Sequence, residues 1–361
     1  MSAVSTLTKI YADRAIQPKA GSPLVGVTSN TVPWELLQAA GFDPVLLSPR
    51  RACTPLADRY MEDVFSARMK AIFDFLLSTE SAPLSAVVVP RTSEQEHKLY
   101  LYLREVARQG SGDLPPEPIL YNLLHARSPE AQAHGLERTQ DLRTALERLG
   151  SRIIQPEALW AAIAEGNAAR QAIRELLRQR EGPAPRLSGT EALALIGAWY
   201  FMRRAEYALL AREALREIQT RPPLAGPRIL IKGSPQDTPD FCAAIEAQGS
   251  IVVAEDDWWG SRAAGSEIDA TGDPIQAIFE KYYFDAPSPR VFPSEIADAW
   301  FHRKAREVDG VIFYLSPEDD VLGWDYPRLR AFLDEQAIPH LMLRAESPDQ
   351  IGAFIERLPN G

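Results

Sequence analysis

Short apolar runs alternate with amphipathic segments in both halves of this chain, and no other feature constrains its fold as strongly. Most runs end in a polar or glycine-containing loop, after which apolar residues recur at helical spacing. The clearest example is the run 86–89, which leads into Thr92, Ser93 and Glu94. Strands that alternate with helices predict a parallel sheet, because each crossover helix packs back onto the sheet.

The alternation divides the chain into three parts. Strands are expected at residues 24–28, 43–47, 86–89 and 118–122, and again at 229–232, 251–254, 310–315 and 340–343. Between these groups, residues 161–180 and 190–220 have helical periodicity, and a proline-rich linker follows at 221–227. We therefore expect an α/β fold with two Rossmann-like or flavodoxin-like lobes, at residues 1–155 and 226–361, each with a small parallel sheet and joined by long helices at 156–225.

Charge and cysteine content argue against several classes of function. Lys and Arg number 39 against 49 Asp and Glu, and the resulting charge of −10 disfavours nucleic acid or a membrane surface as partner. Residues 1–20 lack a signal-peptide core and no run is long enough to span a membrane, so we expect a cytoplasmic protein. Cys53 and Cys242 are far apart and the five histidines lack metal-ligand spacing, so no metal site is predicted.

Polar residues after the predicted strands mark the expected pocket, because ligands of open α/β sheets bind beyond the carboxyl ends of the strands. In the first half these are Asn30, Thr92, Ser93 and Glu94, and in the second half Asp256 and Arg262. Two interpretations of the second set stay open. Asp256 and Arg262 either hold a polar ligand against Trp258 and Trp259, or form a surface ion pair while the tryptophans pack.

Six sequence blocks occur in a recognisable order. The first is Pro33-Trp34-Glu35-Leu36-Leu37, continued by Gly41 and Pro44-Val45, and others lie at 166–170 (Gly-Asn-Ala-Ala-Arg), 187–191, 228–235, 252–262 and 309–313. The series resembles the 2-hydroxyacyl-CoA dehydratase and benzoyl-CoA reductase family of iron–sulfur subunits, including the D-component of 2-hydroxyglutaryl-CoA dehydratase. It extends from about residue 24 to residue 358.

The resemblance implies one [4Fe–4S] cluster per subunit, held by three cysteines, and a dimer of homologous subunits. The matching positions here are Ser93, Phe65 or Ser66, and Asp319 when counted without gaps. Thiolates hold iron–sulfur clusters, and hydroxyl or carboxylate oxygens replace them poorly, so we expect no cluster in this chain. Ser66, Ser93, Glu94 and Asp319 then either line a remodelled pocket that hydrogen-bonds a ligand, or are ordinary helix caps.

The preferred hypothesis is a cluster-free subunit that pairs with a [4Fe–4S]-bearing homologue, as a heterodimer or larger assembly, and shapes part of an acyl-CoA site. The resemblance places this activity in anaerobic metabolism, with a CoA thioester as the expected ligand. One alternative is a catalytic dehydratase or reductase subunit whose cluster has non-standard ligands. The other is a free-standing protein that binds an acyl-CoA or another small acid. No catalytic residue is assigned.

Overall fold

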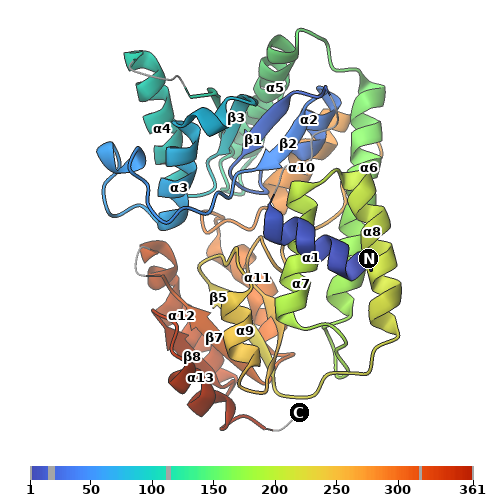
Figure 1. Cartoon of the computed structure of the whole chain (residues 1–361), viewed down its shortest axis with the longest axis vertical. Coiled ribbons are helices and arrows are strands. Elements are labelled where there is room, and N and C mark those ends of the chain that lie inside the picture. The colour runs from blue at the N-terminus through green and yellow to red at the C-terminus, as the bar shows by residue number, and fades with distance from the viewer. Residues whose placement is uncertain (1, 15–20, 111–114, 317–318, 360–361) are drawn as a thin grey trace.

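The computed structural model describes residues 2–14, 21–110, 115–316 and 319–359. Within these ranges the chain forms two four-stranded parallel sheets, one in each half, with helices packed around them (Figure 1). The two-lobed α/β class predicted from the sequence is therefore confirmed. No helix of the described residues combines the length and apolar character needed to cross a membrane.

The two sheets have the same topology. The first has the order β2-β1-β3-β4, with β1 (Leu24–Val27), β2 (Asp43–Leu46), β3 (Leu84–Pro90) and β4 (Glu117–Tyr121). The second has the order β6-β5-β7-β8, with β5 (Arg228–Gly233), β6 (Ile251–Glu255), β7 (Gly310–Tyr314) and β8 (His340–Leu343). Each sheet thus has a topological switch point, between β1 and β3 or between β5 and β7.

Alternate residues of the central strands face opposite helical layers, which explains their unbroken apolar sequences. In β3, Val87 and Val89 pack with α3 (Ala67–Leu76) and α4 (Glu94–Gln109). Ala86 and Val88 join the core beneath α2 (Trp34–Ala39), α5 (Pro129–Gly150) and α6 (Pro156–Arg178). In the second lobe, the faces of β5 pack with α9 (Asp240–Glu246) and α13 (Pro348–Ile355), and with α11 (Ser294–Ala305) and α12 (Asp320–Glu335).

A helical layer runs along one side of both sheets (Figure 1). It contains α6, α7 (Gly189–Gly197) and α8 (Arg204–Gln219) from the middle of the chain, and α1 (Ala3–Asp13), which packs against α7 and α8. The helix α10 (Pro274–Phe284) belongs to the last third of the sequence but packs against α5 and α6. The lobes are therefore joined by helices from three distant parts of the chain.

The single helix predicted at 190–220 is wrong. The chain forms α7 and α8, separated by a 3-10 turn at Ala198–Phe201 and an extended Met202. Tertiary packing causes the break: Trp199, Tyr200 and Phe201 are all buried, and Tyr200 donates a hydrogen bond to the Trp258 carbonyl oxygen at 2.5 Å. The helices α1 and α5 have no counterpart among the predicted elements, whereas all eight predicted strands are present within two residues of the expected bounds.

Candidate binding site between the lobes

The loops after β1 and β3 meet at the switch point of the first sheet. The hydroxyl of Thr31, after β1, is hydrogen-bonded to that of Thr92, after β3, and lies 2.9 Å from Ser29 Oγ. The carbonyl oxygen of Thr92 accepts a hydrogen bond from Ser288 Oγ at 2.8 Å. Because Ser288 follows α10, these bonds fix both loops against a segment from the second half of the chain.

Asn30 connects the first lobe with the loop after β6. Its Nδ2 lies 3.4 Å from the carbonyl oxygens of both Trp258 and Ala263. Its Oδ1 is buried and has no hydrogen-bond partner. Asn30 therefore contributes both an interlobe contact and an unused acceptor.

Ser66 and Ser93 are helix N-caps. Ser93 Oγ accepts a hydrogen bond from Glu96 N at 3.2 Å, and Ser93 N donates to Glu96 Oε2 at 3.1 Å, which is a capping box. Ser66 Oγ accepts from Met69 N and donates to Gln95 Oε1 at 2.7 Å. The two serines thus begin the adjacent helices α4 and α3, and Gln95 of α4 bonds the cap of α3.

Glu94 is not part of the hydrogen-bonded caps that Ser66 and Ser93 form. It is more than half exposed and forms an ion pair with Arg290, and this hydrogen bond holds the pKa of its carboxyl below the usual range. Asp319 lies in the other lobe, where its Oδ1 caps α12 through Leu322 N. Its Oδ2 accepts from Ser234 Oγ at 2.9 Å, so it links the loops after β5 and β7. Among the described residues, no hydrogen bond connects Asp319 or Glu94 with either capping serine. These expected pocket residues therefore do not form one cluster.

Two charged residues lie behind Ser93. Glu96 is buried, accepts a hydrogen bond from Thr28 Oγ1 at 3.1 Å, and has its pKa raised by burial. Arg68 donates to the Thr28 carbonyl oxygen and its guanidinium lies 5.2 Å from the centre of a Trp258 ring. Burial lowers the pKa of Arg68. Glu96 and Arg68 therefore occupy the interior beside the capping serines.

Asp256 and Arg262 form an ion pair in the interior instead of at the surface. Asp256 Oδ1 lies 2.8 Å from Arg262 Nη1, and Oδ2 lies 2.5 Å from Lys232 Nζ. Burial opposes ionisation of Asp256, but the two cations hold its pKa below the usual range. Trp258 and Trp259 are buried and stacked, with ring centres 4.8 Å apart, as the packing interpretation predicts. The carboxylate therefore positions Arg262.

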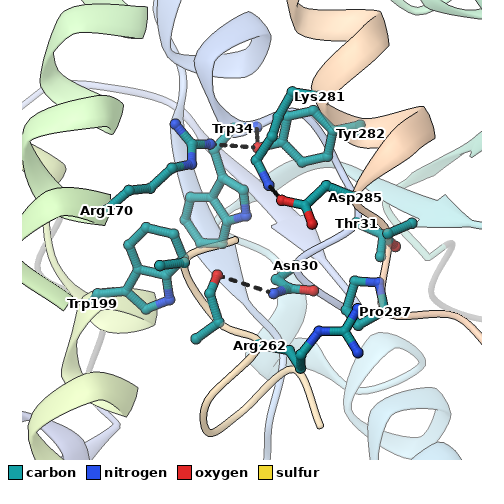
Figure 2. Close-up of a pocket in the computed structure, with 13 residues that line it drawn as sticks. Asn30, Thr31, Trp34, Arg170, Trp199, Arg262, Lys281, Tyr282, Asp285 and Pro287 are labelled. Carbon is teal, nitrogen blue, oxygen red and sulfur yellow. Dashed lines mark hydrogen bonds and ion pairs between the residues drawn. The ribbon is translucent and has the colours of Figure 1, made fainter. Parts of the chain in front are cut away.

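Asn30 and Arg262 share a cavity of about 350 Å³, measured with its open mouth, hereafter the interlobe pocket (Figure 2). It lies where α2, α6, α10, the turn after α7 and the loop after β6 meet. Its walls are formed by Asn30, Thr31, Trp34, Arg170, Trp199, Arg262, Ala263, Ala264, Lys281, Tyr282, Asp285, Ala286 and Pro287. Of the residues expected at a pocket, only Asn30 and Arg262 lie in these walls.

A buried polar group supports one wall of the interlobe pocket. Arg170 Nη2 lies 2.5 Å from Glu35 Oε1, and Tyr282 donates to Glu35 Oε2 at 2.9 Å. Burial opposes ionisation of Glu35, but Arg170 keeps its pKa below the usual range. Next to Tyr282 on α10, Lys281 Nζ lies 2.7 Å from Asp285 Oδ2, and burial lowers the pKa of Lys281.

Most of these wall residues were missed as site residues, although a signal was available for Arg170 and for Glu35, which lies behind the wall. Glu35 and Arg170 belong to the first two blocks of the family resemblance, at 33–45 and 166–170. In the structure these blocks touch: a Cβ added to Gly166 would lie 2.4 Å from Glu35 Oε1. An acidic and a basic residue among the buried apolar positions of two helices could have been paired on this basis. Trp199, Lys281 and Asp285 had no such signal.

The donor set at positions 66, 93 and 319 does not fit a thiolate-held cluster. The oxygens there cap helices and are already hydrogen-bonded. Cys53 is exposed, and Cys242 is buried with its pKa raised well above the usual range by that burial. Among the described residues, no three His, Cys, Asp or Glu side chains are grouped so that they could hold a metal ion.

Residues 30–358 match the family model of the 2-hydroxyglutaryl-CoA dehydratase D-component. The chain belongs to this family. The resemblance carried by the six sequence blocks is thereby confirmed.

Two relatives of this D-component family member are named dehydratase beta subunits. The (R)-phenyllactyl-CoA dehydratase beta subunit of Clostridium sporogenes is 22% identical over 205 residues, which cover 56% of this chain and 55% of that subunit. The beta subunit of (R)-2-hydroxyglutaryl-CoA dehydratase of Acidaminococcus fermentans is 20% identical over 365 residues, or 94% of each chain. The chain thus aligns with about half the length of the first relative and nearly all of the second.

Proposed function

We propose that this D-component family member is the cluster-free subunit of a 2-hydroxyacyl-CoA dehydratase-type or benzoyl-CoA reductase-type complex. It pairs with a homologous subunit that carries the [4Fe–4S] cluster, and it shapes part of the acyl-CoA site. The observation that carries this proposal is the use of Ser66 and Ser93 as hydrogen-bonded helix caps where the family resemblance expects thiolates.

The family blocks support the proposal because they serve packing in this chain. Gly166 leaves room for the Glu35–Arg170 ion pair, and a Cβ on Gly189 would come within 2.5 Å of the Val252 side chain. These contacts join the middle helices to the first and second lobes. The family blocks therefore serve packing in this chain, whereas positions 66, 93 and 319 carry no thiol.

The first test is the iron content of the full chain purified without oxygen. We expect iron and acid-labile sulfide at background level and no broad visible absorption, because the chain has only two cysteines and neither lies at a ligand position. Reconstitution with ferrous iron and sulfide under reducing conditions is the positive challenge. Several irons per chain with an iron–sulfur absorption band would overturn the cluster-free assignment and favour non-standard ligands.

The second test addresses the pairing. A tagged chain purified anaerobically from its own cells should bring down a second family member in equal amount, and that partner should contain the iron. Dehydration of a 2-hydroxyacyl-CoA should then require both chains and a low-potential electron donor. A chain that purifies alone, or that catalyses the reaction alone, would contradict the proposal.

A further inference from the structure

Two indole N–H groups line the interlobe pocket without a hydrogen-bond partner of normal geometry. Trp34 and Trp199 are only 4% and 3% exposed, and the buried Nε1 of each has no hydrogen-bond partner of normal geometry, although Trp199 also interacts with the Tyr200 hydroxyl. Figure 2 shows the two rings together on one side of the pocket, with the nitrogen of each on the side nearer Asn30. A buried donor without a partner costs about 1–3 kcal/mol, so the pair calls for an acceptor in this space.

Charged side chains surround these donors. Three cations, Arg170, Arg262 and Lys281, line the pocket. Each is paired with a carboxylate, because Glu35 lies beside Arg170, Asp256 beside Arg262 and Asp285 beside Lys281. These pairs balance, so an excess of positive charge at the pocket comes from a fourth cation.

A fourth cation stacks on the indoles themselves. The Arg204 guanidinium lies 4.0 Å from the centre of the Trp34 ring and 3.6 Å from that of Trp199, and its Nη2 has no hydrogen-bond partner. Arg204 is buried, and burial lowers its pKa to about 10. A cation on the ring faces makes the indole N–H groups stronger donors and adds to the positive potential.

The Asn30 side chain requires a hydrogen-bond donor instead of an acceptor. Its Oδ1 is an unpaired acceptor in the same pocket, and the two contacts of Nδ2 with carbonyl oxygens fix the orientation of the amide. An acceptor-only ligand would leave Oδ1 unpaired. A ligand with both an oxyanion and a hydroxyl donor would use all three unpaired groups.

We infer that the interlobe pocket binds a small hydroxycarboxylate. Its carboxylate accepts hydrogen bonds from Trp34 and Trp199, and its hydroxyl donates to Asn30. The volume of about 350 Å³ includes the open mouth, so the enclosed space is smaller and limits the ligand to an acid of a few carbon atoms. The site is a property of this chain alone and does not depend on the proposed pairing with a cluster-bearing subunit.

The test uses the full chain and three matched probes of minimal size: glycolate, acetate and glycolamide. Calorimetry and ligand-observed NMR should detect glycolate, weaker binding of acetate, which lacks the hydroxyl, and no binding of glycolamide, which lacks the charge. If none of the three binds, ordered water satisfies the indoles and the inference is overturned. Equal binding of acetate would remove the role of Asn30, and equal binding of glycolamide would remove the anion site.

Variants locate the site. Trp34→Phe and Trp199→Phe keep an aromatic ring but remove one N–H each, so glycolate should bind roughly ten- to hundredfold more weakly. Trp259→Phe is the matched control, because Trp259 Nε1 is also buried and unpaired but does not line the pocket. Unchanged affinity in both pocket variants, with thermal midpoints near that of the control, would overturn the inference.

Glycolyl-CoA separates this site from an acyl-CoA site. The thioester has lost the carboxylate charge, so it should not displace glycolate. Glycolyl-CoA could instead displace glycolate, and Trp34→Phe and Trp199→Phe could weaken its binding as much as they weaken that of glycolate. This result would identify the pocket as the thioester site and overturn the assignment to a free hydroxycarboxylate. The iron and pairing measurements above are unaffected by either result.

Discussion

The substitution Gly166→Ala tests whether the junction between α2 and α6 is as tightly packed as the structure indicates. A Cβ at this position would lie 2.4 Å from Glu35 Oε1 and 2.9 Å from Arg170 Nη1. Glu35 is a flexible residue type, but here its carboxylate is buried and bound to both Arg170 and Tyr282. It cannot move away without leaving a buried cation unpaired.

Opposing effects set the size of the change. Replacing glycine by alanine inside a helix stabilises by roughly 1 kcal/mol through helix propensity. Overpacking costs about 1–3 kcal/mol, and breaking a buried ion pair costs about 3–5 kcal/mol. We therefore expect Gly166→Ala to lower the free energy of unfolding by about 2–4 kcal/mol if Glu35 is displaced.

The assay is urea unfolding followed by circular dichroism and tryptophan fluorescence. Gly323→Ala in α12 is the matched control, because nothing lies within 4 Å of a Cβ added there, and it should be neutral or stabilise by up to about 1 kcal/mol. In a Glu35→Ala background the cost of Gly166→Ala should largely disappear. Two alanine variants of equal stability, or additive effects with Glu35→Ala, would refute the reasoning.

Two further predictions concern pH. Burial raises the pKa of Asp257 to about 7, against about 4 in an unfolded chain, so its contribution to stability is lost as pH rises from about 4 to about 7. Asp257→Asn should flatten that part of the stability curve, and an unchanged slope in urea titrations would contradict the assignment. Burial lowers the pKa of His125 to about 4, below about 6.5 for an unfolded chain, so stability is lost as pH falls from about 6.5 to about 4. His125→Gln should remove this acid sensitivity. Because the Asp257 and His125 effects have opposite slopes, the measurement is the difference in free energy of unfolding between wild type and variant, taken at pH 4.5 and at pH 7. The same difference at both pH values would count against the assignment.

Local sequence signals account for the strands and for the caps. The β3 run is apolar without interruption because helices cover both faces of its sheet, so burial itself is visible in the sequence. Ser66 and Ser93 begin helices through bonds to residues three positions later, which is also local chemistry. The cap interpretation of these two serines could therefore be reached before any fold was known.

The break between α7 and α8 shows where periodicity stops being informative. Residues 198–201 are apolar in a helical context, and the chain turns there because Tyr200 packs against Trp258 and Trp259. A hydrophobic pattern reports that a residue is buried but not which element covers it. The path of the chain at this turn was decided by tertiary contacts.

The sequence by itself determined the two α/β lobes, the order of their strands along the chain and the absence of thiols at the expected ligand positions. Only the tertiary structure decided the interlobe pocket, because Asn30, Trp199 and Lys281 are more than 80 positions apart in any pairing. It also decided that Glu35 and Arg170 neutralise each other in the interior, 2.5 Å apart across 135 positions. Such groups acquire their roles from burial and from one another, and neither is encoded in the residues next to them.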